Sequence, residues 1–298
     1  MKRIERVSLI GLGAVGSVVA TRLADSLGDR FTIIADAARQ ERLRNEGLLF
    51  NGRRYDFALT DKDEPKELIL IATKASALPE ALDAAAPFVG PGTIVLSLLN
   101  GIESEEMVAA RFPEAHVLYS YFLGHPSLRE GNRITHDGNF RIYFGEAQTL
   151  TLSPEAERVG QLFELAGILY EIPPDMRSAL WQKFVINIGC NQTTALLRSP
   201  YGHLQRNDLA MALAVDLMNE AAAVARAIGI AQADEMVERA VEVIHAMNPD
   251  GKSSMLQDTE AGRPTEIDIF AGTLCRLADE LRIPVPLNRA ALRILSAQ

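Results

Sequence analysis

Apolar positions in the first half of the chain come in short, nearly continuous runs, and amphipathic stretches with helical spacing separate these runs. Continuous apolar runs are typical of strands that are covered on both faces. The alternation of strands and helices predicts an α/β domain built on a doubly wound parallel sheet. The expected strands are residues 7–10, 31–36, 67–74, 92–101 and 116–124, with helices at 77–88 and 103–112 between them.

Shorter apolar runs follow the fifth expected strand. Two of them, within residues 132–146, flank Asp137-Gly138, and an Asp-Gly pair between apolar runs predicts a β-hairpin. Ser153-Pro154 then offers an N-cap and a first-turn proline, so we expect another helix to begin there.

The second half of the chain has helical periodicity almost throughout. A last strand is expected at 169–176, where two prolines interrupt the pattern, and we place the domain boundary near Ile172. The sequence therefore predicts a first domain over 1–172 and an all-α domain over 173–298. Its helices include residues 209–228, 233–247 and 266–281.

One helix of this half carries polar residues on an otherwise apolar segment. Within Trp181–Leu196, the residues Lys183, Asn187 and Asn191 recur every four positions and so form one stripe along a helix. A solvated stripe is the simpler interpretation. Asparagine is a poor helix former, however, and two of them beside a lysine suggest a face that holds a ligand.

Composition and charge exclude several classes of function. The net charge is −9 and no basic run occurs, so nothing indicates a nucleic-acid partner. Cys190 and Cys275 have no metal-ligand spacing and are expected to be buried, reduced thiols, which suits a cytoplasmic protein. Because this spacing is lacking, we expect no metal site. The apolar stretch Val7–Ala20 is shorter than a membrane span, so we expect no membrane partner.

A glycine-rich motif follows the first expected strand and opens a helix. Gly11, Gly13 and Gly16 form G-x-G-x-x-G in the strand-turn-helix context that binds dinucleotides. The first glycine permits the tight turn, the second lets the backbone approach a pyrophosphate, and the third allows close packing of helix on strand. The expected cofactor-binding residues of this turn are Gly11, Leu12, Gly13, Ala14, Val15 and Gly16.

Three further residues fall at expected strand ends, where ligands of such a sheet bind. Asp36 ends the second strand and favours NAD, because an acid there accepts hydrogen bonds from the ribose hydroxyls. Arg39 argues for NADP, and Asp36 as a plain turn residue is the alternative. Lys74 and Asn100 end two later strands, which makes both candidates for the site.

A dinucleotide-binding domain followed by a helical domain predicts a cleft that admits the nicotinamide. Hydride delivery to a ketone leaves negative charge on oxygen, which a positioned lysine such as Lys183 can quench if burial lowers its pKa. The asparagines of the stripe could hold other substrate oxygens. Glu266 follows Thr265, which could cap a helix, and this carboxylate could bond the lysine, raising its pKa, or a substrate hydroxyl.

Several separated motifs resemble the ketopantoate reductase (2-dehydropantoate 2-reductase) family over nearly the whole chain. They are GLGAVG, ATK, LLNG, LWQKFVINIGCNQTTAL, SSMLQD, GRPTEID and IPVPLN, in that order. The resemblance implies a Rossmann domain followed by an all-helical domain like that of 6-phosphogluconate dehydrogenase. It also implies NADP(H) as cofactor and, as often in the family, a homodimer.

The resemblance assigns a role to each candidate residue. Lys183 would be the proton donor, and Glu266 would bind the cofactor ribose or the reacting hydroxyl. The residues that would hold substrate are Asn100, Asn187, Asn191 and Ser254, of which Asn100 would also touch the nicotinamide, while Lys74 would bind the cofactor.

Three positions depart from the family pattern. Asp36 stands where the family has an arginine for the NADPH 2′-phosphate. The family usually has a proline after the second asparagine of the helix, whereas Gln192 follows Asn191 here. Tyr201 stands where the family has a third substrate-holding asparagine. We therefore carry three hypotheses. The first is reduction of a 2-oxo acid, above all ketopantoate; the second is an NAD-dependent 2-hydroxyacid dehydrogenase for bulkier substrates; the third is a non-catalytic dinucleotide sensor.

Overall fold

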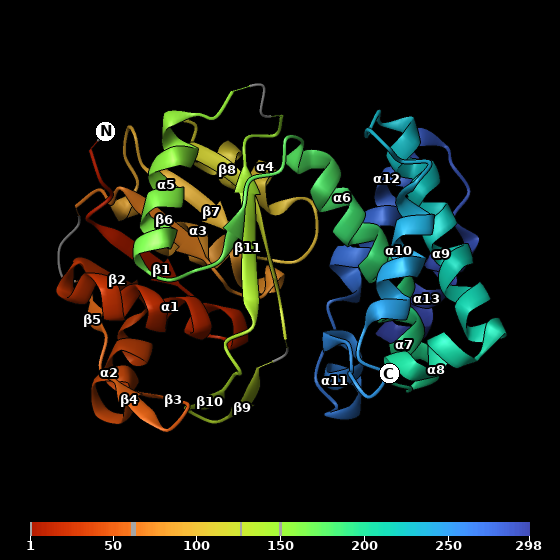
Figure 1. Cartoon of the computed structure of the whole chain (residues 1–298), viewed down its shortest axis with the longest axis horizontal. Coiled ribbons are helices and arrows are strands. Elements are labelled where there is room, and N and C mark those ends of the chain that lie inside the picture. Colours follow the sequence, from red (N-terminus) through yellow and green to blue (C-terminus); the bar gives the residue numbers. More distant parts are fainter. Residues whose placement is uncertain (1, 61–63, 126, 149–150) are drawn as a thin grey trace. The chain divides into compact units, whose positions relative to one another are not determined.

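The computed structural model describes residues 2–60, 64–125, 127–148 and 151–298. The chain divides into two compact units, Met1–Met176 and Arg177–Gln298. The boundary expected near Ile172 falls shortly before this division. Figure 1 shows that the first unit holds the strands, whereas the second consists of helices.

The first unit is built on an eight-stranded sheet with the order β12-β11-β8-β7-β6-β1-β2-β5. The strands from β5 to β8 pair in parallel, as the sequence predicts. The remaining edge departs from a purely parallel sheet, because β11 runs antiparallel to β8. The strands are β1 (Val7–Ile10), β2 (Phe31–Ile34), β5 (Ala58–Leu59), β6 (Leu68–Ile71), β7 (Ile94–Ser97), β8 (His116–Gly124), β11 (Phe140–Gly145) and β12 (Tyr170–Glu171).

Helices cover both faces of this sheet, which confirms the doubly wound architecture (Figure 1). Alternate residues of β6 show it: Leu68 and Leu70 pack with α1 and α5, whereas Ile69 and Ile71 pack with α3 and α4. All four side chains are fully buried, and each burial contributes about 1.5–3 kcal/mol to folding. The helices are α1 (Ala14–Leu27), α2 (Ala37–Glu46), α3 (Leu78–Ala85), α4 (Ser104–Arg111) and α5 (Pro154–Leu165), with 3₁₀ turns η1 (Gly28–Arg30), η2 (Ala75–Ala77) and η3 (Ala86–Phe88).

A second, four-stranded sheet with the order β4-β3-β10-β9 lies beside α2 (Figure 1). A hairpin that the sequence analysis did not predict joins β3 and β4 through Asn51-Gly52, whose φ values of 49° and 81° suit a tight two-residue turn. The strands are β3 (Leu48–Phe50), β4 (Arg53–Tyr55), β9 (Leu128–Glu130) and β10 (Arg133–Thr135).

The hairpin predicted around Asp137-Gly138 is wrong. A turn exists there, since Gly138 has a φ of 86° and the backbone N–H groups of Gly138 and Asn139 donate to the side chains of His136 and Asp137. The strands on its two sides belong to different sheets, however. β10 pairs with β9 and β3, whereas β11 pairs along its whole length with the long strand β8. β11 therefore pairs with β8, the longer apolar strand, and not with β10, which is nearer in the sequence.

The second unit is all-helical, as predicted, and two π-helical segments interrupt its helices. In the part of the chain that the structure describes, no helix is both long and apolar enough to cross a membrane. The elements are α6 (Met176–Ile186), η4 (Asn187–Asn191, π), α7 (Gln192–Leu197), α8 (Tyr201–Arg206), α9 (Asp208–Ala227), α10 (Met236–Ala246), α11 (Ser254–Glu260), η5 (Asp268–Gly272, π), α12 (Thr273–Leu281) and α13 (Pro286–Ser296).

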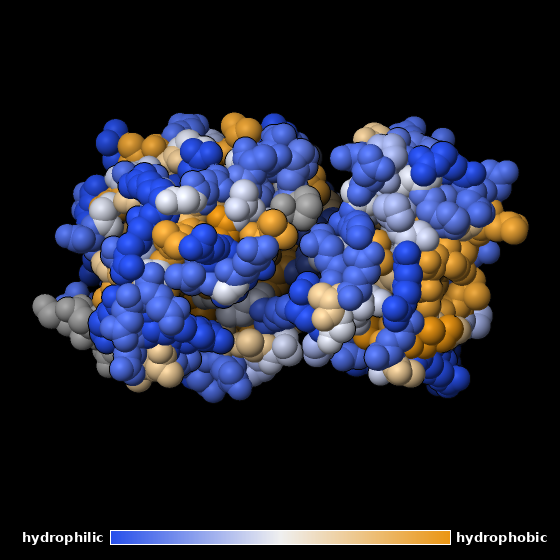
Figure 2. Space-filling view, turned by 90° about the horizontal axis from the view of Figure 1, so that it is seen from below, coloured by the Kyte–Doolittle hydropathy of each residue, from blue (hydrophilic) through white to orange (hydrophobic). Residues whose placement is uncertain are grey.

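Apolar residues also reach the surface of the helical unit. Figure 2 shows them gathered on one of its faces, in contrast to the mostly hydrophilic surface of the first unit in that view. The helical unit exposes 83% of Leu209 and 50% of Ile294, for example. Contiguous exposed apolar surface of this kind is a common feature of interaction faces.

Candidate active site

The glycine-rich turn between β1 and α1 is shaped by two close backbone contacts. Gly11 has a φ of +97°, and a Cβ there would lie 2.5 Å from the carbonyl oxygen of Ala72. A Cβ on Gly16 would lie 1.8 Å from the carbonyl oxygen of Gly11, so the helix could not pack this closely on the strand. Both glycines therefore have the structural roles that the motif predicts.

Gly13 has no such reason within the protein. Its φ is −83°, which any residue adopts, and a Cβ there would meet nothing closer than the Ala72 carbonyl oxygen at 3.9 Å. Gly13 is also the N-cap of α1, where no side chain caps the helix and no acidic residue occupies the first turn. This opening beside free N–H donors fits the pyrophosphate of a dinucleotide.

The other candidates of the first unit follow neighbouring strands of the sheet. Ile10 of β1 lies opposite Ile34 of β2 and Ile71 of β6, which in turn lies opposite Ser97 of β7. The segments after these residues therefore share one edge of the sheet, which holds the glycine turn, Asp36, Lys74 and Asn100. The strands end earlier than predicted, and Lys74 and Asn100 lie in the segments just beyond β6 and β7.

Asp36 is the N-cap of α2. Its Oδ1 accepts a hydrogen bond from the backbone N–H of Arg39 at 2.7 Å, and its Oδ2 lies 3.6 Å from Arg39 Nε. Both side chains are more than half exposed. Capping accounts for an aspartate at this position, so a role at the ribose stays a prediction.

A buried polar network supports the segment that carries Asn100. Ser97 Oγ donates to Ser104 Oγ at 2.7 Å, and Ser104 Oγ donates to the carboxyl of Glu105 at 2.9 Å. The backbone N–H of Ser120 also donates to this carboxyl, at 3.3 Å. Burial raises the pKa of Glu105 to about 7, against the opposing effect of these hydrogen bonds. The sequence alone does not indicate this network, since Ser104-Glu105 is an ordinary pair at the start of a helix.

Two residues around β9 reach the glycine-rich turn from far along the chain. Ser127 Oγ donates to the carbonyl oxygen of Ala14 at 3.0 Å, and Arg129 Nη1 donates to that of Leu12 at 3.3 Å. No local pattern predicts a contact between residues 117 positions apart. The turn therefore has a second wall that sequence analysis did not find.

In the second unit, the polar stripe begins on α6 and continues on the π-helical segment η4. Asn191 Nδ2 donates to Asn187 Oδ1 at 3.3 Å, so the two amides do lie together. In a regular α-helix, residues four apart drift by about 40° around the axis. A π-turn has more residues per turn and moves the next residue back, so Lys183, Asn187 and Asn191 keep closer to one line than in a regular α-helix.

Packing against α9 accompanies the π geometry. A Cβ on Gly189 would lie 2.4 Å from Met218 Cγ and 2.9 Å from the carbonyl oxygen of Ala214. Thr194 Oγ1 donates to the carbonyl oxygen of Cys190, four residues before it, at 2.8 Å. Cys190 is buried, and burial raises the pKa of its thiol to about 12. It is therefore an inert core residue, as the sequence predicts.

The serine pair upstream of Glu266 divides its roles. Ser253 is the buried N-cap of α11, bonding the N–H of Leu256 at 3.1 Å and sharing a 2.7 Å hydrogen bond with Thr194. Ser254 is the exposed first residue of the helix. Glu266 lies just before η5, and η5 contacts η4. The helical unit thus carries the candidates Lys183, Asn187, Asn191, Ser254 and Glu266 in one compact body.

The structure accounts for one departure from the family pattern and describes another. Gln192 is fully buried, and its Nε2 donates to Asn288 Oδ1 at 3.2 Å, which ties α7 to α13. Asn288 Nδ2 in turn donates to Glu220 on α9 at 2.8 Å. Tyr201 packs its ring against Gly251, where a Cβ would lie 3.0 Å away, and burial raises the pKa of its hydroxyl.

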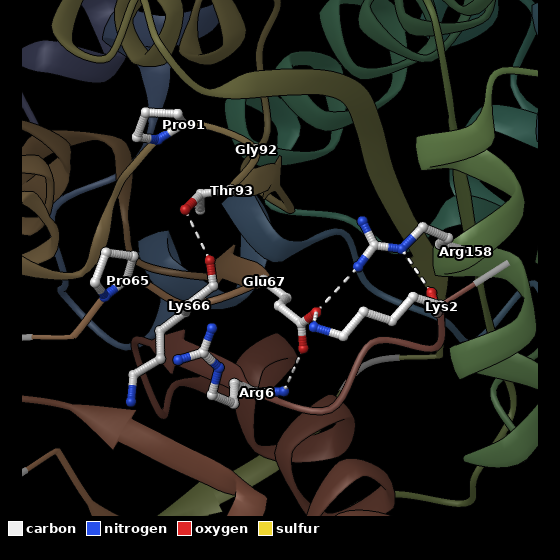
Figure 3. A pocket seen from close by; sticks show the side chains of 9 residues that line it. All are labelled: Lys2, Arg6, Pro65, Lys66, Glu67, Pro91, Gly92, Thr93 and Arg158. Carbon is white, nitrogen blue, oxygen red and sulfur yellow. Dashed lines mark hydrogen bonds and ion pairs between the residues drawn. The ribbon is translucent and has the colours of Figure 1, made fainter.

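A hollow of about 390 Å³ opens at the opposite edge of the first sheet, before the strands begin (Figure 3). Glu67 is paired there with Lys2 at 3.4 Å and Arg158 at 3.2 Å. Arg6 and Lys66 also line it, and neither side chain has a carboxylate partner among the described residues, although the backbone N–H of Arg6 donates to Glu67. The hollow shares no lining residue with the glycine-rich turn.

Comparison with known proteins places these features in context. A 2-dehydropantoate 2-reductase from Archaeoglobus fulgidus is 28% identical over 296 residues, covering 98% of this chain and 97% of that protein. The crystal structure of 2-dehydropantoate 2-reductase from Geobacter metallireducens matches with a TM-score of 0.84 at 27% identity, covering 98% and 99% of the two chains. A D-mandelate dehydrogenase in complex with NADH shares the fold, with a TM-score of 0.86 at 20% identity and 98% of each chain covered.

The family described as ketopantoate reductase PanE/ApbA matches residues 7–149, and its C-terminal domain matches residues 175–298. Together the two matches take in the glycine-rich turn, the strand ends with Lys74 and Asn100, and the stripe of α6 and η4. The chain therefore belongs to the ketopantoate reductase family of oxidoreductases.

Proposed function

We propose that this chain reduces the 2-oxo group of ketopantoate to the hydroxyl of pantoate, with a nicotinamide dinucleotide as reductant. The observation that carries the proposal is the row of Lys183, Asn187 and Asn191, in which the Asn191 amide donates to that of Asn187 beside the lysine's helix. A proton donor next to two neutral amides suits a substrate that has one reacting carbonyl and other oxygens to be held.

Lys183 would provide the proton of the reaction. When bound, the reduced nicotinamide supplies the hydride for the carbonyl carbon. As negative charge develops on the carbonyl oxygen, the Lys183 ammonium donates its proton, so that a C–H and an O–H bond form and the carbonyl becomes a hydroxyl. Lys183 is half-buried beside the buried Phe184, on the face that carries the two asparagines.

The remaining candidates would bind and orient. Asn187 and Asn191 would hold the substrate's hydroxyl and carbonyl oxygens without adding charge. Ser254, exposed at the start of α11, would bind the carboxylate. Glu266 would bind the cofactor ribose or the reacting hydroxyl, and Asn100 would contact both the nicotinamide and the substrate.

The dinucleotide would lie along the carboxyl edge of the first sheet. The opening at Gly13 and the uncapped start of α1 support the pyrophosphate there, and Lys74 would add a positive charge. The family resemblance favours NADP(H), whereas Asp36 favours NAD(H). The residues that would hold the cofactor are Gly11, Leu12, Gly13, Ala14, Val15, Gly16, Asp36, Lys74, Asn100 and Glu266.

The test is the loss of cofactor absorbance at 340 nm with ketopantoate, run in parallel with NADPH and NADH. Lys183→Ala should lower kcat at least about 100-fold, the usual effect of losing a general acid. Lys66→Ala, which removes a lysine from the opposite edge of the first sheet, is the matched control and should leave kcat unchanged. Full turnover by Lys183→Ala would remove the proton-donor assignment.

A second candidate is an NAD-dependent 2-hydroxyacid dehydrogenase for bulkier 2-oxo acids, and Tyr201 is the observation that favours it. Its side chain is half-buried in the helical unit, and burial, with a smaller contribution from Cys190 of η4, raises the pKa of its hydroxyl. An aromatic ring there would prefer apolar substrates over the polar ketopantoate. The same assay with a panel of 2-oxo acids separates the two: ketopantoate as the best substrate by kcat/KM excludes this candidate.

A further inference from the structure

We propose that Arg129, together with Arg39 and Arg42 of α2, forms the site that receives the 2′-phosphate of NADP(H). The inference rests on the proposed dinucleotide binding and deepens it, since it names the residues that choose NADPH over NADH. It replaces the single family arginine, whose position is occupied here by Asp36, with residues from two other segments.

Arg129 is held beside the glycine-rich turn. Its Nη1 donates to the carbonyl oxygen of Leu12, at the centre of the glycine-rich turn, and its Nε donates to Gly131 at the tip of the β9-β10 turn. Ser127, two residues before Arg129, donates from its hydroxyl to the carbonyl oxygen of Ala14 in the same turn. Two hydrogen bonds therefore hold the guanidinium beside the turn, and three of its five N–H groups are left to take another acceptor.

The start of α2 carries two further arginines near the expected position of the adenosine ribose. The glycine turn and the start of α2 follow the paired ends of β1 and β2, and in this fold the adenosine ribose lies between those two segments. Arg39 and Arg42 lie three residues apart in the first turns of α2, so they share one face of the helix.

The small sheet joins these two parts. β3 follows α2 directly and pairs with β10, and Asn132 Nδ2 donates to the carbonyl of Glu46 at the end of α2 at 3.4 Å. Figure 1 shows β9 and β10 in line with β3 beside α2. Arg129 is thus brought to the glycine turn by the same sheet that is attached to α2.

The positive charges of Arg129, Arg42 and Arg39 lie in the same region of the first unit. Partial burial lowers the pKa of Arg129, and repulsion from Arg42 and Arg39 lowers it further, so both arginines of α2 lie within electrostatic range of Arg129. Arg39 is paired with Asp36, but within the described residues neither Arg42 nor Arg129 has a carboxylate partner. Uncompensated arginines at one place on a chain of net charge −9 indicate a bound anion.

Asp36 does not oppose this anion. One of its oxygens caps α2 and the other faces Arg39 Nε, so its charge is largely engaged within the helix start. A 2′-phosphate carries up to two negative charges and several acceptor oxygens, which matches converging guanidinium groups, whereas the ribose hydroxyl of NAD(H) would leave the charges of Arg42 and Arg129 uncompensated.

The experiment measures dissociation constants of NADP⁺ and NAD⁺ by isothermal titration calorimetry on the whole chain, without substrate. Arg129→Ala should weaken NADP⁺ binding tenfold or more while NAD⁺ binding changes less than threefold, since one charge-assisted bond to the phosphate is lost. Arg42→Ala, an exposed change on α2 with no hydrogen bond at risk, should act in the same direction. Arg6→Ala removes an arginine that lines the hollow at the opposite edge and whose side chain has no carboxylate partner among the described residues, and it should change neither constant.

The other outcomes separate a failure of this inference from a failure of the proposed function. Equal weakening of both dinucleotides by Arg129→Ala would place that residue at the pyrophosphate and overturn the proposal, as would tighter binding of NAD⁺ than of NADP⁺ by the unaltered chain. If neither dinucleotide binds, the proposed function fails together with this inference. If NADP⁺ binds and depends on Arg129 but ketopantoate is not reduced, the inference stands and only the substrate assignment fails.

Discussion

The two units present their candidate residues in opposite ways. The first unit collects them from the ends of four neighbouring strands, so that Gly13, Asp36, Lys74 and Asn100 are far apart in the chain and adjacent only because the sheet pairs in register. The second unit carries its central candidates on one continuous stretch, α6 and η4. A strand-end site depends on backbone packing between segments, whereas a helical site depends on the regularity of a single helix.

The largest effect is expected where the strand-end site depends on packing. Gly16→Ala places a Cβ 1.8 Å from the Gly11 carbonyl oxygen and should destabilise the first unit by about 3 kcal/mol, because neither backbone segment can move freely. Gly13→Ala is the matched control. Its Cβ would make only an ordinary contact with the Ala72 carbonyl oxygen at 3.9 Å, so urea unfolding should show little change although dinucleotide binding is lost. Equal destabilisation by the two changes would mean that the turn packs differently.

The next effect concerns the buried carboxyl below the Asn100 segment. The pKa of Glu105 rises from the ordinary 4.5 to about 7 on folding, so the folded chain binds the proton more tightly than the unfolded chain. Stability from this group is therefore complete below pH 4.5 and is lost as the pH rises through 7, by about 3 kcal/mol in total.

Glu105→Gln should flatten this dependence in urea unfolding measured from pH 5 to pH 8. Glu106→Gln changes the exposed neighbouring carboxyl and serves as the control, with the pH dependence retained. An unchanged slope in Glu105→Gln would show that the carboxyl is already ionised in the folded protein.

A smaller effect tests the helical site. Gly189→Ala should cost about 1–3 kcal/mol and lower kcat, because the Cβ meets Met218 Cγ at 2.4 Å and η4 must move away from α9. Gly272→Ala in the other π segment is the control, since its Cβ has only ordinary contacts from 3.6 Å outward. A drop in kcat for Gly272→Ala equal to that for Gly189→Ala would break the comparison, because the effect would then not be specific to the segment with the asparagines.

The parts of the fold that could be predicted depend on local patterns. Strands covered on both faces leave continuous apolar runs, so the core strands β1, β6 and β7 were found, with ends that differ by a few residues. The glycine-rich turn could be predicted because its three glycines follow a strand at a fixed spacing, and the protein's own packing requires two of them, Gly11 and Gly16. The row of Lys183, Asn187 and Asn191 was visible because helical spacing brings residues four apart together.

The parts that could not be predicted depend on choices between distant partners. β11 pairs with β8 rather than with the adjacent β10, and only the assembled sheet decides this. The π geometry of η4 accompanies the contact of Gly189 with Met218, which no sequence window contains. The approach of Arg129 to Leu12 is of the same kind. The capping role of Ser253 differs from these, since a serine before a helix is a local signal that was available.

The aromatic packing of α6 has a practical consequence. Trp181 is the single tryptophan of the chain, it is 4% exposed, and its ring meets that of Phe184 edge-on at 5.3 Å. It stands next but one to Lys183, at the start of the polar row. Intrinsic tryptophan fluorescence of the unlabelled protein therefore reports from one known place, so an optical titration can test for ligand binding at this helix without any engineered dye.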